Sequence, residues 1–284
     1  MTEPSPTPLA EPGPTTRLCF AGVAFDVTPA PSAGWALDDE HRNASATFDA
    51  SPVVGLVRCA VAAADVPCGE REVRWAWDGD LASVSTSRVR GEVRRLRPGH
   101  YAASMLVAPG AAGSSSALTA LAALIVQREG GLVLHAAGVE LEGRAVLFIG
   151  PSGAGKTTAS HLCPGARWLC RDRAAVYPTS RGWWVAPMCG GDAIDLPRSS
   201  AASLPVGAIL RVRRDGTTAI SRTERWAALR DLRESIQSGD AGGGQLELDA
   251  ALRLIDEAPL GRASTVLGEP LTPALRAWLA EHAS

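Results

Sequence analysis

Val146-Leu-Phe-Ile-Gly-Pro-Ser-Gly-Ala-Gly-Lys-Thr-Thr158 is the segment from which the organisation of this chain can be worked out. Between Gly150 and Thr157 it follows the pattern G-x-x-x-x-G-K-[ST], which is typical of a loop that binds phosphate groups. The apolar run 145–149 predicts a buried strand before the loop, and residues 157–163 predict a short helix after it. Strand, loop and helix therefore come in the order that a phosphate-binding loop requires.

The residue types in this loop suit the binding of a triphosphate and a metal ion. Glycines let the backbone curl so that successive N–H groups point at phosphate oxygens, beside the positive end of a helix. Lys156, the only lysine among 28 basic residues, would reach the β- and γ-phosphates, and the Thr157 hydroxyl would ligate Mg²⁺. We expect the nucleotide to be bound by Gly150, Ser152, Gly153, Ala154, Gly155, Lys156, Thr157 and Thr158. The alternative is a glycine-rich turn that binds nothing.

The chain has 284 residues, enough for one large or two ordinary domains, and its composition changes along its length. The proline-rich residues 1–16 predict a disordered leader. Short apolar segments broken by turn residues predict a smaller β-rich domain over 17–108. Small residues at 109–115 predict a linker, and strands mixed with helices predict an α/β domain over 116–284.

Charge and cysteine content exclude several classes of partner. The net charge is −2 and the pI about 6.2, so we expect no nucleic-acid partner. No apolar run approaches the roughly 20 residues of a membrane span, and the N-terminus lacks the features of an export signal. The 6 cysteines form no C-x-x-C pair, which favours free thiols in the cytoplasm over a zinc site.

Arginine is concentrated in the β-rich part, between Arg88 and Arg97. Five of these ten residues are arginine, a density that fits either an acidic partner or a solvated strand face. We favour the solvated face, because charged runs on strands usually point to water. Nearby, Asp78-Gly79 between two alternating segments predicts a hairpin turn.

A second hairpin is predicted where Leu132–Leu141 meets the strand before the phosphate loop. A two-residue turn at Glu142-Gly143 pairs Leu141 with Arg144, and continuing that register pairs His135 with Gly150. The sheet is then mixed, and His135 lies beside the loop. This histidine is either a functional group, as a phosphate donor or a partner to a carboxylate, or a hydrogen-bonded structural residue.

The strand predicted at 166–170 delivers Arg171-Asp172-Arg173 at its C-terminal end, where ligands gather in open α/β sheets. Asp172 could hold Mg²⁺ or accept the proton of a substrate hydroxyl. The alternative is a surface ion pair with its arginine neighbours. Further along, Ser221-x-x-Glu224 predicts a capping box for a helix to about residue 237, with a buried stripe at Trp226, Leu229, Leu232 and Ile236.

Together these segments resemble the HPr kinase/phosphorylase-like family, in particular stand-alone relatives found among peptide-tailoring enzymes. The resemblance covers about 130–210 and depends on 131–139, the phosphate loop, the strand ending in Asp172, and Ala186-Pro-Met-Cys-Gly-Gly191. It implies a phosphoenolpyruvate-carboxykinase-like P-loop kinase domain with a mixed sheet, Mg-ATP as donor, and a serine hydroxyl as acceptor. Relatives of this kind often self-associate, which leaves a homo-oligomer open.

One position departs from the family pattern. Relatives usually carry two consecutive aspartates after this strand, whereas this chain has Arg171-Asp172. In relatives the first aspartate acts on the acceptor hydroxyl and the second faces the metal, so if Asp172 takes the second place the usual base is missing. Either Asp172 does both jobs, or His135 helps, or the enzyme is weak or inactive. We expect Asp172, His135 and Lys156 as catalytic residues, with Thr157 and Asp172 at the metal.

The leading interpretation is a Mg-ATP-dependent kinase that acts on a serine of a peptide or small protein. Arg171 keeps open a catalytically weak or inactive nucleotide-binding scaffold that recognises a partner. A kinase for a small hydroxylated molecule is the third interpretation, since nothing in the sequence fixes the size of the acceptor.

Overall fold

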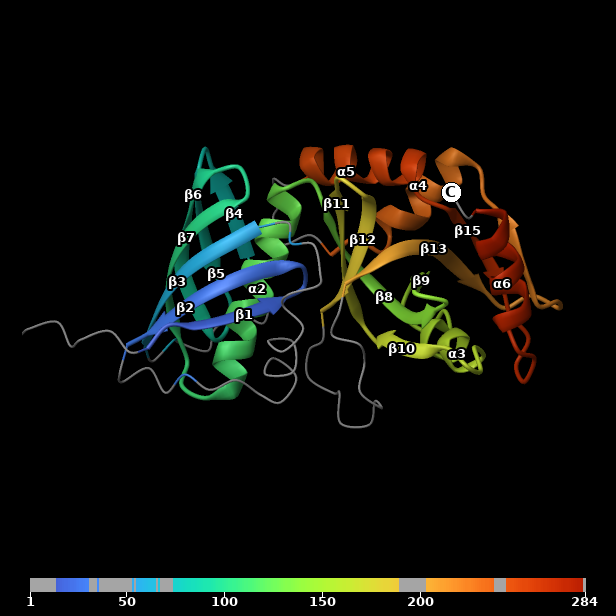
Figure 1. The fold of residues 1–284 in the computed structure, drawn as a ribbon, viewed down its shortest axis with the longest axis horizontal. Coiled ribbons are helices and arrows are strands. Elements are labelled where there is room, and N and C mark those ends of the chain that lie inside the picture. Colours follow the sequence, from blue (N-terminus) through green and yellow to red (C-terminus); the bar gives the residue numbers. More distant parts are fainter. Residues whose placement is uncertain are drawn as a thin grey trace, which may run out of the picture.

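In a computed structural model of the chain, which describes residues 14–30, 35, 53, 55–64, 66, 74–188, 203–237 and 244–282, two β-sheets lie side by side with one helix between them (Figure 1). Most of the leader expected at 1–16 and of the loop expected at 187–192 lies outside these residues. Thr16 already belongs to the first strand.

The first sheet has seven strands in the order β1-β2-β3-β7-β6-β5-β4, and it is mixed because β3 runs parallel to both β2 and β7. Residues 55–61, 81–85 and 101–107 of this sheet alternate between buried and less buried positions, so one face there is a core face and the other meets water. Its elements are β1 (Thr16–Phe20), β2 (Val23–Pro29), β3 (Gly55–Ala63), β4 (Arg74–Asp78), β5 (Leu81–Ser85), β6 (Val89–Arg97) and β7 (His100–Val107).

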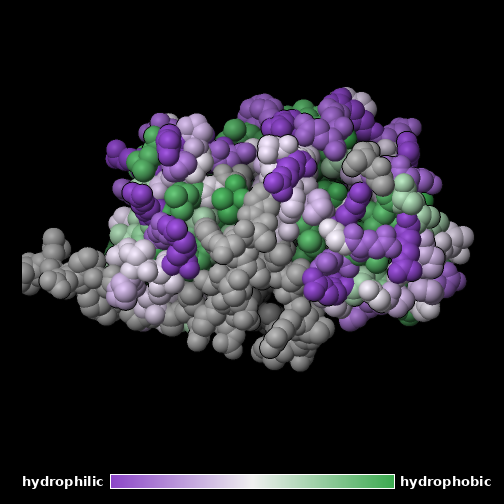
Figure 2. Space-filling view, viewed as in Figure 1, coloured by the Kyte–Doolittle hydropathy of each residue, from purple (hydrophilic) through white to green (hydrophobic). Residues whose placement is uncertain are grey.

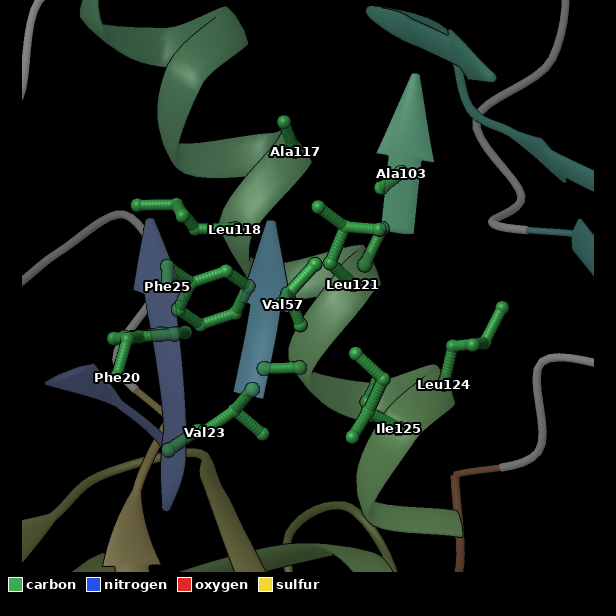
Figure 3. Close-up of a cluster of buried hydrophobic side chains, with 14 of the residues drawn as sticks. Phe20, Val23, Phe25, Val57, Ala103, Ala117, Leu118, Leu121, Leu124 and Ile125 are labelled. Carbon is green, nitrogen blue, oxygen red and sulfur yellow. The ribbon is translucent and has the colours of Figure 1, made fainter. Parts of the chain in front are cut away.

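Helix α2 (Ala111–Arg128) covers the core face of this sheet. Figure 3 shows Leu118, Leu121 and Ile125 of the helix among Phe25 and Val57 of the strands. The helix begins at Ala111, so most of the segment expected as a linker, 109–115, is helical. It is apolar on nearly all sides, as expected of a helix packed between two layers.

The same core continues into the second sheet. Val133, Ala175 and Tyr177 of that sheet belong to the cluster that α2 forms with the first sheet. Gly22, with a φ of 77°, turns directly over the Tyr177 ring, where an added Cβ would come within 2.4 Å. The two sheets are therefore joined through shared packing as well as through the chain.

The second sheet has eight strands and is also mixed. Its main path is β10-β8-β11-β12-β13-β15-β14, and β9 pairs with both β8 and β13. Its elements are β8 (Leu132–Leu141), β9 (Arg144–Ile149), β10 (Arg167–Cys170), β11 (Arg173–Thr179), β12 (Gly182–Pro187), β13 (Leu204–Arg213), β14 (Ala219–Arg222) and β15 (Leu260–Ser264).

Helices pack against both faces of this sheet. The helices α4 (Arg225–Arg233) and α5 (Gly244–Glu257) contribute to one apolar cluster, and α3 (Lys156–His161) and α6 (Thr272–Glu281) to another. The expected mixed α/β fold is thereby confirmed. Figure 2 shows mainly hydrophilic residues along the top of the molecule, over α4 and α5. None of the helices in the described part of the chain is both long and apolar enough to span a bilayer.

The predicted register between β8 and β9 is confirmed. Leu141 pairs with Arg144, and the antiparallel ladder continues to Ala136 opposite Ile149. Glu142 and Gly143 both have positive φ angles, 54° and 74°, as a two-residue turn of type I′ requires. His135 is the next residue of β8, one step beyond the last pair and level with the start of the phosphate loop.

The prediction for the segment after β13 is wrong in two respects. Ser221 lies in β14, and the helix begins at Arg225 without a side-chain cap and ends at Arg233. Trp226 is 73% exposed rather than buried. Ala228 and Leu232 lie on the buried side of α4. Trp226 is two positions before Ala228, so it points to the opposite, solvent-facing side of the helix.

Candidate functional site

The phosphate loop runs from Gly150 to Gly155, between the end of β9 and the start of α3. Gly150, Gly153 and Gly155 have φ angles of 145°, 77° and 98°, which side chains with a Cβ rarely adopt. Within the described residues, the amides of Gly153, Gly155 and Lys156 have no hydrogen-bond acceptor in the protein. The loop therefore offers several N–H groups to an anion, as a phosphate cradle must.

The Lys156 side chain folds back onto the start of this loop. Its side chain is buried, and its Nζ donates to the carbonyl oxygens of Gly150 at 2.9 Å and Pro151 at 3.1 Å. Burial lowers the pKa of Lys156, the negative charge of Asp172 opposes this shift, and the positive charge of Arg211 adds to it. No carboxylate of the described residues forms an ion pair with it, so an incoming anion would meet an ammonium held by two neutral carbonyls.

His135 and Asp172 are brought together by the sheet. The imidazole Nδ1 lies 2.9 Å from Asp172 Oδ1 and 3.0 Å from the Asp172 carbonyl oxygen. The backbone is fixed there too, because the Ala136 amide donates to the same carbonyl at 2.9 Å and the His135 amide donates to Ser235 at 2.7 Å. Asp172 is thus anchored at the junction of β10 and β11, against the middle of β8.

The Asp172 carboxylate remains accessible. Its side chain is 52% exposed, and its second oxygen lies 3.3 Å from Nε of Arg173. The ion pair with an arginine neighbour, considered from the sequence, therefore exists, but it involves Arg173 and leaves room for the histidine. A half-exposed carboxylate oriented by an imidazole is chemically able to accept a proton from a hydroxyl group.

Arg171 points to a different partner. Its guanidinium carbon lies 5.8 Å from the centre of the Trp168 ring, and the His161 ring meets the same tryptophan edge-on at 4.8 Å. A cation–π contact at an exposed site stabilises by about 0.5–1 kcal/mol, so it favours this position of the arginine. Arg171 therefore lies beside the end of α3.

Two arginines that were not predicted from the sequence also lie at the loop. Strand β13 runs parallel to β9 with Arg211 opposite Ile149, so the end of β13 emerges beside the phosphate loop. Arg211 is held by Glu234 at 2.6 Å, and Arg214 donates to the Gly153 carbonyl oxygen at 3.5 Å. The three arginines within 211–214, directly after an apolar strand, could have indicated an anion-binding site. That interpretation requires knowing that β13 is the neighbour of β9.

The residues that could hold Mg²⁺ are few but chemically suitable. The described residues contain no group of three or more histidine, cysteine or acidic side chains that could form a complete metal cage. Mg²⁺ in nucleotide sites uses one or two protein oxygens together with phosphates and water. The exposed Thr157 hydroxyl at the start of α3 and the Asp172 carboxylate fit such a donor set.

Comparison with known proteins gives a match to a family and matches to solved structures. The family described as SynChlorMet cassette protein ScmC matches residues 112–235 of this chain. Among solved structures, the chain is similar to the Hpr(Ser) kinase/phosphatase from Coxiella burnetii, with 13% sequence identity, a TM-score of 0.32, and coverage of 53% of this chain and 90% of that chain. No curated protein matches the sequence.

Proposed function

We propose that this protein is a Mg-ATP-dependent kinase that transfers the γ-phosphate to a serine hydroxyl of a peptide or small protein, on a P-loop domain of the phosphoenolpyruvate-carboxykinase-like type. One observation carries the proposal. The His135–Asp172 pair, joined at 2.9 Å, lies level with the start of the phosphate loop, because β8 pairs with β9 up to Ala136 opposite Ile149. A proton acceptor and a phosphate cradle thus occur together.

In this proposal Asp172 accepts the proton of the serine hydroxyl. The hydroxyl oxygen forms a bond to the γ-phosphorus, the bond to the β–γ bridging oxygen breaks, and ADP leaves with that electron pair. His135 orients the carboxylate through its Nδ1 atom, so it acts through Asp172. Phosphoryl transfer needs mainly positioning and charge neutralisation, which Lys156 and the loop amides provide.

Thr157 and Asp172 would hold Mg²⁺, which when bound supplies positive charge to the phosphates. The same carboxylate then serves both the metal and the acceptor hydroxyl. This double role is consistent with a chain that has an arginine where relatives have their first aspartate.

A test combines labelled ATP with serine-containing peptides, beginning with peptides encoded beside the gene, and detects phosphoserine by mass spectrometry. Phosphorylation of such a peptide by the parent, lost in Asp172→Asn, supports the proposal and its extension to peptide natural-product tailoring. Tight Mg-ATP binding without phosphate transfer to any peptide, protein or free hydroxy amino acid contradicts it.

A nucleotide-binding scaffold is the second candidate function, and the contact of Arg171 with Trp168 favours it. An arginine fixed beside the site is an unusual replacement for a catalytic carboxylate. A scaffold would bind Mg-ATP through Lys156 and change its affinity for a partner protein, without consuming ATP. Rates of ATP turnover in parent and Asp172→Asn that are equal and negligible would favour this function.

A further inference from the structure

An open pocket of about 410 Å³ lies beside the phosphate loop, on the side opposite to β8, and the mechanism above does not use it. It is formed because β13 is the parallel neighbour of β9, so the residues after β13 run alongside the loop. The pocket is lined by Pro151, Gly153, Ala154, Arg211, Val212, Arg213, Arg214 and Asp215.

One end of this pocket is cationic and touches the loop. The Arg211 side chain packs on Gly150, where an added Cβ would lie 3.6 Å from its Nε atom. The Arg214 guanidinium packs on Gly155 in the same way, at 3.4 Å. Arg211 is paired with Glu234 at 2.6 Å. Arg214 forms no ion pair within the described residues, so it extends the positive charge of Lys156 away from the His135–Asp172 pair.

The other end presents an acceptor. Oδ2 of Asp215 accepts a hydrogen bond from the Ser264 hydroxyl at 2.9 Å. Ser264 is the last residue of β15, which runs parallel to β13, so this bond fixes the carboxylate to the sheet. Within the described residues Oδ1 of Asp215 has no hydrogen-bond donor, and a carboxylate oxygen there can accept from a ligand.

Along the chain the lining therefore changes from arginines that contact the loop to Asp215, an acceptor that is bonded to β15. A nucleoside triphosphate has the matching order, with anionic phosphates followed by the hydroxyl donors of ribose. A second phosphate at the far end would meet the negative charge of Asp215, which disfavours it.

We propose that this pocket is the ribose subsite of the nucleotide, with Asp215 accepting hydrogen bonds from the 2′- and 3′-hydroxyls and Arg214 contacting the α-phosphate. The inference rests on the proposed binding of ATP at the phosphate loop. It gives Asp215 a role in selecting ribonucleotides. None of the site residues predicted from the sequence has that role.

The test measures binding by calorimetry with three probes, Mg-ATP, Mg-2′,3′-dideoxyATP and Mg-tripolyphosphate. The parent should bind ATP about tenfold or more tightly than dideoxyATP, because hydrogen bonds to a charged acceptor are lost. Asp215→Ala should bind both nucleotides with the affinity that the parent has for dideoxyATP. Its affinity for tripolyphosphate should equal that of the parent.

The outcomes separate this inference from the proposed function. A parent that binds ATP and dideoxyATP equally well, or an Asp215→Ala variant that keeps the parent's preference, overturns the ribose subsite while ATP binding stands. An equal loss of affinity for tripolyphosphate in Asp215→Ala also overturns it, since Asp215 would then act on the loop. A parent that binds none of the three probes overturns the proposed function itself. Asp256→Ala, which removes a carboxylate from α5, is the control and should bind like the parent.

Discussion

Nδ1 of His135 lies 2.9 Å from Oδ1 of Asp172, although 37 residues separate them in the chain. The contact forms because β8 passes between β9 and the junction of β10 with β11. The carboxylate is held from one side by the imidazole and from the other by Arg173, while half of it faces solvent. Asp172 is therefore the first residue to substitute in a test of the proposed mechanism.

Asp172→Asn should lower the rate of phosphoryl transfer by about 10²–10⁴-fold, because an amide cannot accept the proton of the serine hydroxyl. The affinity for Mg-ATP should fall much less, since the loop and Lys156 remain. Single-turnover kinetics at saturating Mg-ATP measure the rate, and calorimetry measures the affinity.

The matched control for this variant is Asp256→Asn. The Asp256 side chain is 54% exposed and pairs with Arg225, much as that of Asp172 is 52% exposed and pairs with Arg173. It lies on α5 and should transfer phosphate at the parent rate. Transfer at the parent rate by Asp172→Asn would rule out the proposed catalytic role.

Lys156→Ala should weaken Mg-ATP binding by about ten- to a hundredfold, as expected for the loss of charged hydrogen bonds to phosphate. Lys156→Arg should not restore binding. The lysine is only 7% exposed, and a planar guanidinium is larger than the compact ammonium that donates to the two carbonyls.

Calorimetry compares both variants with Arg181→Ala, which removes an exposed cation from the turn between β11 and β12. This control should bind Mg-ATP like the parent. Unchanged affinity in Lys156→Ala would show that the loop is not the nucleotide site.

Arg171→Asp would give the chain the two consecutive aspartates that its resemblance to the HPr kinase-like family implies, yet we expect it to lower the transfer rate by about tenfold. A second carboxylate would repel the γ-phosphate and remove a cation held against Trp168. Arg171→Lys should keep more of the rate, because it keeps the charge. A faster Arg171→Asp variant would mean instead that the arginine impairs the transfer reaction.

The buried thiol of Cys170 should make folding stability sensitive to alkaline pH. Burial, helped by the charge of Asp172, raises the pKa of Cys170 from 9.0 to about 12. The folded state therefore favours the protonated thiol, and this contribution is complete below about pH 9 and is lost as the pH rises towards 12.

Urea unfolding of the parent and of Cys170→Ala, followed from about pH 8 to about pH 10.5, measures this effect. The unfolding free energy should fall more steeply with pH in the parent. Equal slopes would show that the thiol does not stay protonated in the folded protein. Cys19, Cys59 and Cys163 are also buried free thiols, and they contribute to the slope in both proteins equally.

Local features of the site could be predicted because short segments determine them. The turn at Glu142-Gly143 fixes the register of β8 on β9, and the register places His135. The phosphate loop and the hairpin of β11 with β12 are equally local. The sequence around Ser221 was misinterpreted for a related reason, since the strand β14 forms through pairing with β15, forty residues further along the chain.

The arginines at the loop could not be predicted from local sequence. Arg211 lies beside Ile149 only because β13 joins the sheet next to β9, and no turn or spacing reveals that neighbour. In the same way, the run from Arg88 to Arg97 divides between two environments that depend on distant partners. Arg90 and Arg94 are exposed, whereas Arg95 pairs with Glu129 at the end of α2.

Helix α2 belongs to the hydrophobic cores of both sheets, and Gln127 near its end strengthens that link. Its side chain accepts a hydrogen bond from Trp75 of β4 and donates to the Gln237 carbonyl oxygen, at 3.1 Å and 3.2 Å. If either sheet unfolds, α2 loses its packing partner on that side and the other sheet loses part of its core. The molecule should therefore melt as one cooperative unit. A substitution in the core of the first sheet would then reduce the amount of folded protein. The measured activity would fall, although the substituted residue makes no contact with the phosphate loop or the His135–Asp172 pair. Loss of activity in such a variant would identify a stability defect, and a partner-binding role for that sheet must be sought in variants that melt like the parent.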